Sequence, residues 1–265
     1  MGIDSNPVAG KFLASARALL ERLEVQSDTI DAASRLCADA IGGGGLVHAF
    51  GTGHSRMPVE ELFPRYGSYP GFHPIVELSM TFHTQVVGAN GQRQAMFIER
   101  VEGLAEHILA NFDLGLPDAM IVFSHGGLTA APIEMAQGAR RRGLPVIAVT
   151  SVAHSRAAEP AHSSGTRLLD HADVVLDLAT PPGDALVRVD GVEEPIGPGS
   201  TIAAIALANE LKVRTASLLA TRGVLPPVLT SPAVVGRERS AQLFDEAYAE
   251  HARRLARVLR TADTS

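Results

Sequence analysis

The feature that most constrains the fold is a series of five short apolar runs, most of which end at a turn of glycine, serine or threonine. The runs are residues 46–50, HPIVEL around Ile75, 119–123, 144–150 and 173–178. Runs of this length and composition are typical of strands buried on both faces. Helical patterns separate several of them, which predicts right-handed βαβ crossovers and a parallel sheet with helices on both faces.

Helices are expected at both ends of the chain. One helical region covers residues 7–41, with Leu13 on its apolar face and a break near Ser27, and further helices cover 133–142, 200–221 and 240–260. In the last helix we expect Leu243, Phe244 and Tyr248 on the apolar side, and Arg253, Arg254 and Arg257 on the solvated side. An Asp190-Gly191 pair within 185–196 predicts a surface hairpin.

No linker or repeat divides the chain, so we expect one domain over 1–265. Its parts are a helical region at 1–41, an α/β core at 42–200 and C-terminal helices at 201–265.

Charge and composition disfavour several classes of binding partner and site. The net charge of −6 disfavours nucleic acid and anionic membrane. Cys37 is the only cysteine, so no internal disulfide or cysteine-based zinc cage is possible. We find no signal peptide and no run of membrane-spanning length, which predicts a cytoplasmic protein.

Two turns carry the strongest chemical signal. The first is GTGHS at 51–55, directly after an apolar run, in which Gly53 allows close backbone approach and Ser55 offers a hydroxyl. The second is SHGGLT at 124–129, after another run. The residues of this turn that offer hydroxyl, imidazole or backbone N–H groups to a ligand are Ser124, His125, Gly126, Gly127 and Thr129. Both turns should open on the carboxyl edge of the sheet, where open α/β proteins bind ligands.

Two further turns follow later strands or precede a helix. In TSVAHS at 150–155, Ser155 is either a ligand of the same anion or a helix cap. In GPGST at 197–201, Ser200 or Thr201 is expected to cap the next helix.

These residues resemble the sugar isomerase (SIS) domain family over roughly 42–180. The family has a G-x-G-x-S turn after its first strand, here GTGHS, and an S-x-S-G-x-T turn after a later strand, here SHGGLT. The resemblance implies a doubly wound, three-layer αβα sandwich around a five-stranded parallel sheet, with a phosphosugar as ligand and a homodimer or homotetramer as assembly. The second serine of the later turn is Gly126 here, so one hydroxyl ligand is missing.

Two glutamates are candidates for the catalytic base. SRMPVEELFPRYG is similar to the segment after the first turn in phosphoheptose isomerases, and this likeness puts Glu61 on their catalytic glutamate. Glu77, at the end of the second apolar run, is the other candidate, and either carboxylate could instead be a surface or ion-paired group. His54 is an acid/base candidate near neutral pH. Arg56, directly after the first turn, is the best candidate to pair with an anionic substrate.

Neither a metal nor another cofactor is expected. Met57 stands where the phosphoheptose isomerases have a metal-binding histidine, and no histidine occurs between Ser200 and Leu225. The ten histidines show no spacing typical of a zinc site. A metal site built from histidines distant in the sequence, such as His73, His83 and His154, stays an alternative. His48, inside an apolar run, is interpreted as a satisfied core residue. GTGHSR fails the dinucleotide pattern G-x-G-x-x-G at Arg56, which disfavours nicotinamide binding.

The sequence therefore predicts a protein that binds a phosphorylated sugar and isomerises it between aldose and ketose forms, or converts it in a related way. The alternative is a non-catalytic phosphosugar sensor that acts through a protein partner.

Overall fold

The computed structural model describes residues 8–81 and 92–259, and its centre is a five-stranded parallel sheet. The strands are β1 (Val47–Gly51), β2 (Phe72–Ile75), β3 (Ala119–Phe123), β4 (Val146–Thr150) and β5 (Val174–Asp177). Their spatial order is β2-β1-β3-β4-β5, and every neighbouring pair runs parallel. The predicted five-stranded α/β fold is confirmed, and its order is that of a doubly wound sheet whose winding reverses between β1 and β3.

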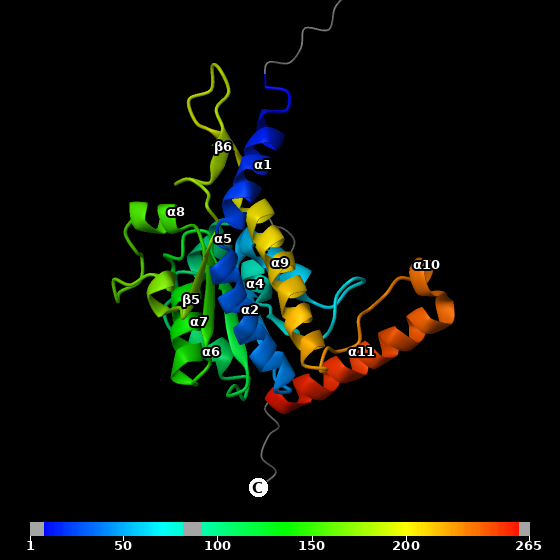
Figure 1. Cartoon of the computed structure of the whole chain (residues 1–265). Helices are drawn as coiled ribbons and strands as arrows, with labels where there is room; N and C mark the ends of the chain where they lie inside the picture. The colour runs from blue at the N-terminus through cyan, green and yellow to red at the C-terminus, as the bar shows by residue number, and fades with distance from the viewer. Residues whose placement is uncertain (1–7, 82–91, 260–265) are drawn as a thin grey trace, which may run out of the picture.

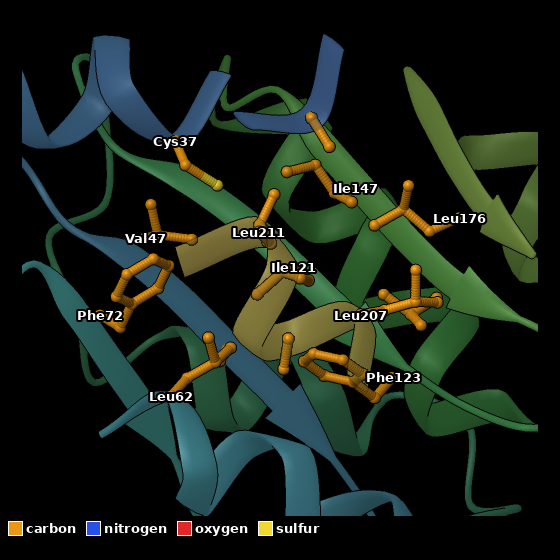
Figure 2. Packing of buried hydrophobic residues seen from close by; sticks show 14 of the residues in the cluster. Cys37, Val47, Leu62, Phe72, Ile121, Phe123, Ile147, Leu176, Leu207 and Leu211 are labelled. Carbon is orange, nitrogen blue, oxygen red and sulfur yellow. The ribbon is translucent and has the colours of Figure 1, made fainter. Parts of the chain in front are cut away.

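One face of the sheet is covered by α1 (Lys11–Glu24), α2 (Ser27–Gly42), α3 (Arg56–Leu62) and α9 (Ser200–Thr221). Figure 2 shows the contact: side chains of the strands, Val47, Ile121 and Leu176 among them, meet Leu207 and Leu211 of α9. All five are almost fully buried. Cys37 of α2 belongs to the same layer as a buried free thiol.

The opposite face packs on α6 (Leu104–Leu109) and α7 (Ala130–Arg141). Because consecutive residues of a strand point to opposite faces, Met120 and Val122 join this second cluster while Ile121 and Phe123 join the first. Shorter helices complete the structure around the sheet edges: α4 (Leu78–Thr81), α5 (Gln92–Ile98) and α8 (Val152–Ala157). The result is the predicted three-layer arrangement.

The break in the N-terminal helical region has a specific cause. Gln26, between α1 and α2, donates from its side chain to the Asp177 carbonyl at 2.7 Å and accepts from the Asp177 amide at 2.8 Å. Its amide thus satisfies the free edge of β5, and the helix bends there as predicted. Leu13 differs from the prediction: it is 69% exposed, because α1 packs through Ala16, Leu19 and Leu23.

The C-terminal part consists of α10 (Pro232–Val235) and the long α11 (Arg237–Val258), which runs along the end of the sheet opposite the β6 hairpin (Figure 1). The predicted solvated arginine face is wrong for Arg254, which is buried and donates to the carbonyls of Ile41 and Gly45, each at 2.7 Å. Phe244 and Tyr248 are half-exposed and stack on each other, with ring centroids 4.4 Å apart.

The predicted hairpin is present as β6 (Ala185–Val187) and β7 (Ile196–Pro198), paired antiparallel beside α1 (Figure 1). Within the described ranges, no helix combines the length and apolar character that crossing a membrane requires.

Candidate functional site

Two loops meet where the winding of the sheet reverses. The chain leaves β1 into a short 3-10 turn, Gly53–Ser55, which continues into α3. A side chain at Gly51 would lie 2.3 Å from the Ser55 carbonyl oxygen, so only glycine allows the turn to fold back this tightly. The chain leaves β3 into the loop 124–129, and Thr129 then precedes α7 with an extended backbone. Both turns open on the carboxyl edge of adjacent strands.

Two adjoining cavities lie at this edge. The loop cavity, of about 380 Å³, is lined by Thr52, Ser55, Glu99, Arg100, Ser124, His125, Gly126, Gly127, Leu128, Thr129, His154, Glu159 and Ala161. The α9 cavity, of about 290 Å³, is lined by His54, Ser55, Pro58, Phe123, Ser124, His125, Val149, Leu178, Asp184, Pro198, Ser200, Thr201 and Ala204. Ser55, Ser124 and His125 line both, so residues of the two loops share one continuous wall. These volumes suit a small-molecule site.

The loop after β3 is held in shape by hydrogen bonds within the loop and from the end of β4. The Gly127 amide donates to Ser124 Oγ at 3.1 Å, and the His125 carbonyl accepts from Thr150 Oγ1 at 3.0 Å and from the Ser151 amide at 2.8 Å. Gly127 has φ +61°, a conformation that favours glycine. The loop is therefore shaped before any ligand arrives.

Glu99 is a site residue that the sequence analysis missed. It lines the loop cavity, where Oε2 accepts from Thr52 Oγ1 at 2.9 Å. Burial raises the pKa of this carboxyl, while the Thr52 hydrogen bond and the charge of Arg100 act in the opposite direction. Its backbone carbonyl accepts from the Ala131 amide of α7 at 2.9 Å, which anchors Glu99 beside the second loop. No motif surrounds Glu99 in the sequence, so only the fold reveals it.

His125 stands between the two cavities in a polar network. Its Nε2 lies 3.1 Å from Thr180 Oγ1 and 3.7 Å from Asp184 Oδ1, and its ring is 4.5 Å from the His154 ring between centroids. Burial and the neighbouring His154 lower the pKa of His125, and Asp184 opposes them. An imidazole placed beside a carboxylate and a second imidazole is a group that can accept and release a proton.

Asp184 also corrects an expectation about α9. We expected Ser200 or Thr201 to cap this helix, but Asp184 Oδ1 accepts from the amides of Gly199 and Ser200 at 3.1 and 2.7 Å. Oδ2 accepts from Ser200 Oγ at 2.6 Å. A side chain from the preceding loop thus satisfies the helix start, since an aspartate oxygen accepts amide hydrogen bonds well there.

The other predicted site residues lie around the cavities without lining them. Gly53 separates Thr52 from His54, which both line a cavity. Arg56 donates from Nη1 to the Thr81 carbonyl at 2.6 Å. Ser155 is buried inside α8, whose cap is instead Ser151, and within the described ranges its Oγ has no hydrogen-bond partner.

Neither sequence-derived base candidate lines the two cavities. The Glu61 carboxylate pairs with Arg65 at 3.0 Å. The backbone carbonyl of Glu61 accepts from Lys212 Nζ at 2.9 Å. Glu77 accepts from the Ser79 amide and hydroxyl at 3.3 and 2.9 Å. The catalytic role of Glu61 or Glu77 therefore stays a prediction.

No metal centre is formed by the residues described: none of their histidine, cysteine, aspartate and glutamate side chains gather in a group of three suited to an ion. His83 lies outside the described residues. His48 is fully buried, with Nδ1 2.9 Å from His73 Nδ1, but its Nε2 lies 3.7 Å from Asp118 and finds no hydrogen bond among the described residues.

The fold and the convergent loops define a doubly wound α/β protein with a ligand site at the switch point of its sheet. A family model described as the SIS domain matches residues 11–151, more than half of the chain. A UPF0309 protein of Streptomyces coelicolor is 38% identical over 242 residues, covering 90% of this chain and 94% of that protein. One from Halalkalibacterium halodurans is 34% identical over 231 residues, covering 87% and 93%. The chain belongs to the SIS domain family, and its curated relatives are UPF0309 proteins.

Solved structures of lower similarity include a phosphoheptose isomerase from Francisella tularensis. It is 15% identical with a TM-score of 0.49, and the match covers 78% of this chain and 95% of that one. The Vibrio vulnificus NanR protein complexed with ManNAc-6P is 15% identical with a TM-score of 0.46, covering 83% and 64%.

Proposed function

We propose that the chain binds a phosphorylated sugar at the carboxyl edge of β1 and β3 and moves a proton between neighbouring carbons of that sugar. Membership of the SIS domain family supports a phosphosugar-related function. The observation that carries the proposal is that a half-buried carboxylate, Glu99, lines the same cavity as the hydroxyls and glycines of the two loops.

In this proposal the phosphate lies in the loop cavity against Ser55, Ser124 and Thr129, whose hydroxyls are suited to donate to its oxygens. Arg100, which also lines this cavity, adds positive charge. The carbonyl end of the sugar then lies between Glu99 of the loop cavity and His125, and the remaining hydroxyls face the α9 cavity, which Ser200 and Thr201 line.

Glu99 is proposed as the base. A carboxylate whose pKa is raised by burial accepts a proton more readily than an exposed one. It would remove the proton from the carbon next to the carbonyl of an aldose phosphate and return it to the former carbonyl carbon. His125 would transfer the remaining proton between the two oxygens, so that the enediol becomes a ketose and no oxidant or reductant is needed.

The test is solvent exchange. The protein is incubated in D₂O with a panel of aldose and ketose phosphates, and product formation and deuterium incorporation next to the carbonyl are followed by NMR. We expect both for at least one sugar phosphate, and we expect Glu99→Gln to abolish them while the ligand still binds. Glu61→Gln and Glu77→Gln are measured in parallel, because loss of exchange in one of these instead would move the base there.

Binding of a sugar phosphate without exchange or product would support the alternative, a phosphosugar sensor. The homo-oligomeric assembly and cytoplasmic location expected from the sequence stay predictions, and light scattering after size-exclusion chromatography measures the former.

A further inference from the structure

The glycine at position 126 is explained by one neighbouring side chain. The φ angle of Gly126 lies outside the left-handed region, so the backbone itself does not require glycine. A Cβ placed there would lie 3.1 Å from Cδ2 and 3.2 Å from Nε2 of His154, whereas its distance to Leu128, 3.5 Å, is an ordinary contact. The His154 ring would therefore have to shift by a few tenths of an ångström to admit a side chain at 126.

The helix cap positions the backbone of His154, and a hydrogen bond from another segment orients its ring. His154 lies in α8, and its backbone amide donates to Ser151 Oγ at 3.2 Å. Its Nδ1 accepts from the Gly183 amide at 3.0 Å. A ring nitrogen that accepts a hydrogen bond carries no proton, so in this arrangement the proton is on Nε2, which lies 3.2 Å from the Cβ position of residue 126.

Two groups of the loop that could donate to an anion are engaged or missing. The Gly127 amide is already engaged by Ser124 Oγ, so it is not directed at an anion in this arrangement. The SHGGLT turn also lacks the serine hydroxyl that the family pattern has at position 126. His154 lines the same cavity as Ser124 and Thr129, and an imidazole N–H is a good donor to phosphate.

We propose that His154 is an anion-binding residue of this site, and that Gly126 and His154 act as a pair in which the imidazole Nε2–H donates to phosphate in place of a side-chain hydroxyl at 126. This rests on the proposed function for the identity of the ligand as a phosphate monoester. The anion site itself is tested independently, with inorganic phosphate.

The experiment is a double-mutant cycle read by isothermal titration calorimetry, with inorganic phosphate first and then the sugar phosphate that binds most tightly. His154→Ala is expected to weaken binding about 10- to 100-fold, the usual effect of losing a hydrogen bond to a charged group. Gly126→Ser should also weaken it, because the new side chain displaces the ring. Gly126→Ser combined with His154→Ala should recover most of the loss, since the serine hydroxyl then has room to donate.

His107→Ala, an exposed histidine of α6 that lines neither cavity, is the control and should bind as the wild type does. His154→Gln, which retains an N–H donor, should bind more tightly than His154→Ala and provides a second reading if the double variant does not fold. The proposal is overturned if His154→Ala binds phosphate as tightly as the wild type, if the two substitutions weaken binding additively, or if the wild type has no affinity for phosphate at millimolar concentration. Failure of the proposed function is distinct: it would appear as intact binding without deuterium exchange or product.

Discussion

At the scale of single residues, the site depends on a few side chains whose surroundings change their chemistry. Glu99 is the clearest case. Its carboxyl is half-buried beside Thr52 and lies next to loop residues that the fold brings in from elsewhere in the chain. Burial raises the pKa of this carboxyl, and a carboxylate with a raised pKa is a stronger base than an exposed one.

Glu99→Gln is expected to lower kcat by about 10²- to 10⁴-fold, because the amide cannot accept the proton, while the dissociation constant of the ligand changes little. In the wild type, the acid limb of kcat against pH should lie above the ordinary glutamate pKa of 4.5, since the raised pKa keeps the carboxyl protonated to a higher pH. Steady-state kinetics across a pH series measure both. Glu21→Gln, on the exposed side of α1, is the control; a Glu99→Gln enzyme with unchanged kcat would exclude this base.

A second prediction at this scale concerns Gly127. Alanine there must adopt φ +61°, and its Cβ would lie 2.9 Å from Leu168 Cβ and 3.1 Å from Thr150 Oγ1. We expect Gly127→Ala to lower the free energy of unfolding by about 3 kcal/mol, through backbone strain and overpacking together.

Gly165→Ala is the matched control for that measurement. Gly165 has a similar φ of +67°, but nothing lies within 4 Å of an added Cβ. Gly165→Ala should lower the free energy of unfolding by about 1 kcal/mol, because only the backbone strain contributes. Urea unfolding of both variants separates crowding from strain, and equal losses would contradict the reading of the loop as tightly packed.

At the scale of elements, the strands were predictable and the helix surfaces only partly so. Runs such as 119–123 are apolar on both faces, and a parallel sheet is the arrangement that buries both. The two loops were predictable because each directly follows such a strand. Glu99 and His154 were not, since their partners are distant in sequence: Glu99 contacts Thr52, and His154 contacts Gly126 and Gly183.

The same limit applied to α11. An arginine at a helix surface is ordinarily solvated, which made Arg253 and Arg254 look equivalent in the sequence. The structure distinguishes them: both pair with Glu250, but Arg253 is 65% exposed in its side chain and Arg254 only 6%. Arg254 also donates to one carbonyl in the last turn of α2 and to one just after it, and no local sequence pattern indicates these contacts.

This difference gives a prediction for the element. Arg254→Met should lower the free energy of unfolding by about 3 kcal/mol, because it removes the charged donor that the carbonyls of Ile41 and Gly45 share and takes away a buried ion-pair partner of Glu250. Arg253→Met, one position away and paired with the same glutamate, should change it by less than about 1 kcal/mol. Thermal and urea unfolding of the two variants measure this, and equal effects would show that α11 is not held through Arg254.

At the scale of the whole molecule, α11 is held against the sheet by a buried polar cluster at the end opposite the candidate site. Asp118, just before β3, accepts from the Leu46 amide at 2.9 Å and pairs with Arg257 of α11. His48 of β1 and His73 of β2 contact each other across the strands, and the His73 ring lies 6.4 Å from that of His251 on α11. Three histidines and one carboxylate thus face each other where the sheet meets its last helix.

This cluster predicts acid sensitivity. Burial, followed by the neighbouring His48 and His251, lowers the pKa of His73 to about 3, against 6.5 for an ordinary histidine, although Asp118 opposes the shift. Between those values the unfolded chain binds a proton that the folded chain excludes. Stability should therefore be fully present above pH 6.5 and fall as the pH drops toward 3, by up to about 1.4 kcal/mol per pH unit from this group alone.

His73→Gln removes the titrating group while retaining an amide that can hydrogen-bond to His48. Carboxylates elsewhere also lose stability in acid, so the informative quantity is the difference in slope between variant and wild type. We expect the plot of unfolding free energy against pH to be shallower for His73→Gln between pH 6.5 and 4, and unchanged for His107→Gln at an exposed position. Urea unfolding across this range supplies the data, and NMR of ring-labelled histidine should show His73 still neutral in the folded protein at pH 5. Equal slopes in His73→Gln and wild type, or a His73 that protonates near pH 6.5 without unfolding, would mean that the cluster does not exclude protons and that the contact between α11 and the sheet tolerates charge.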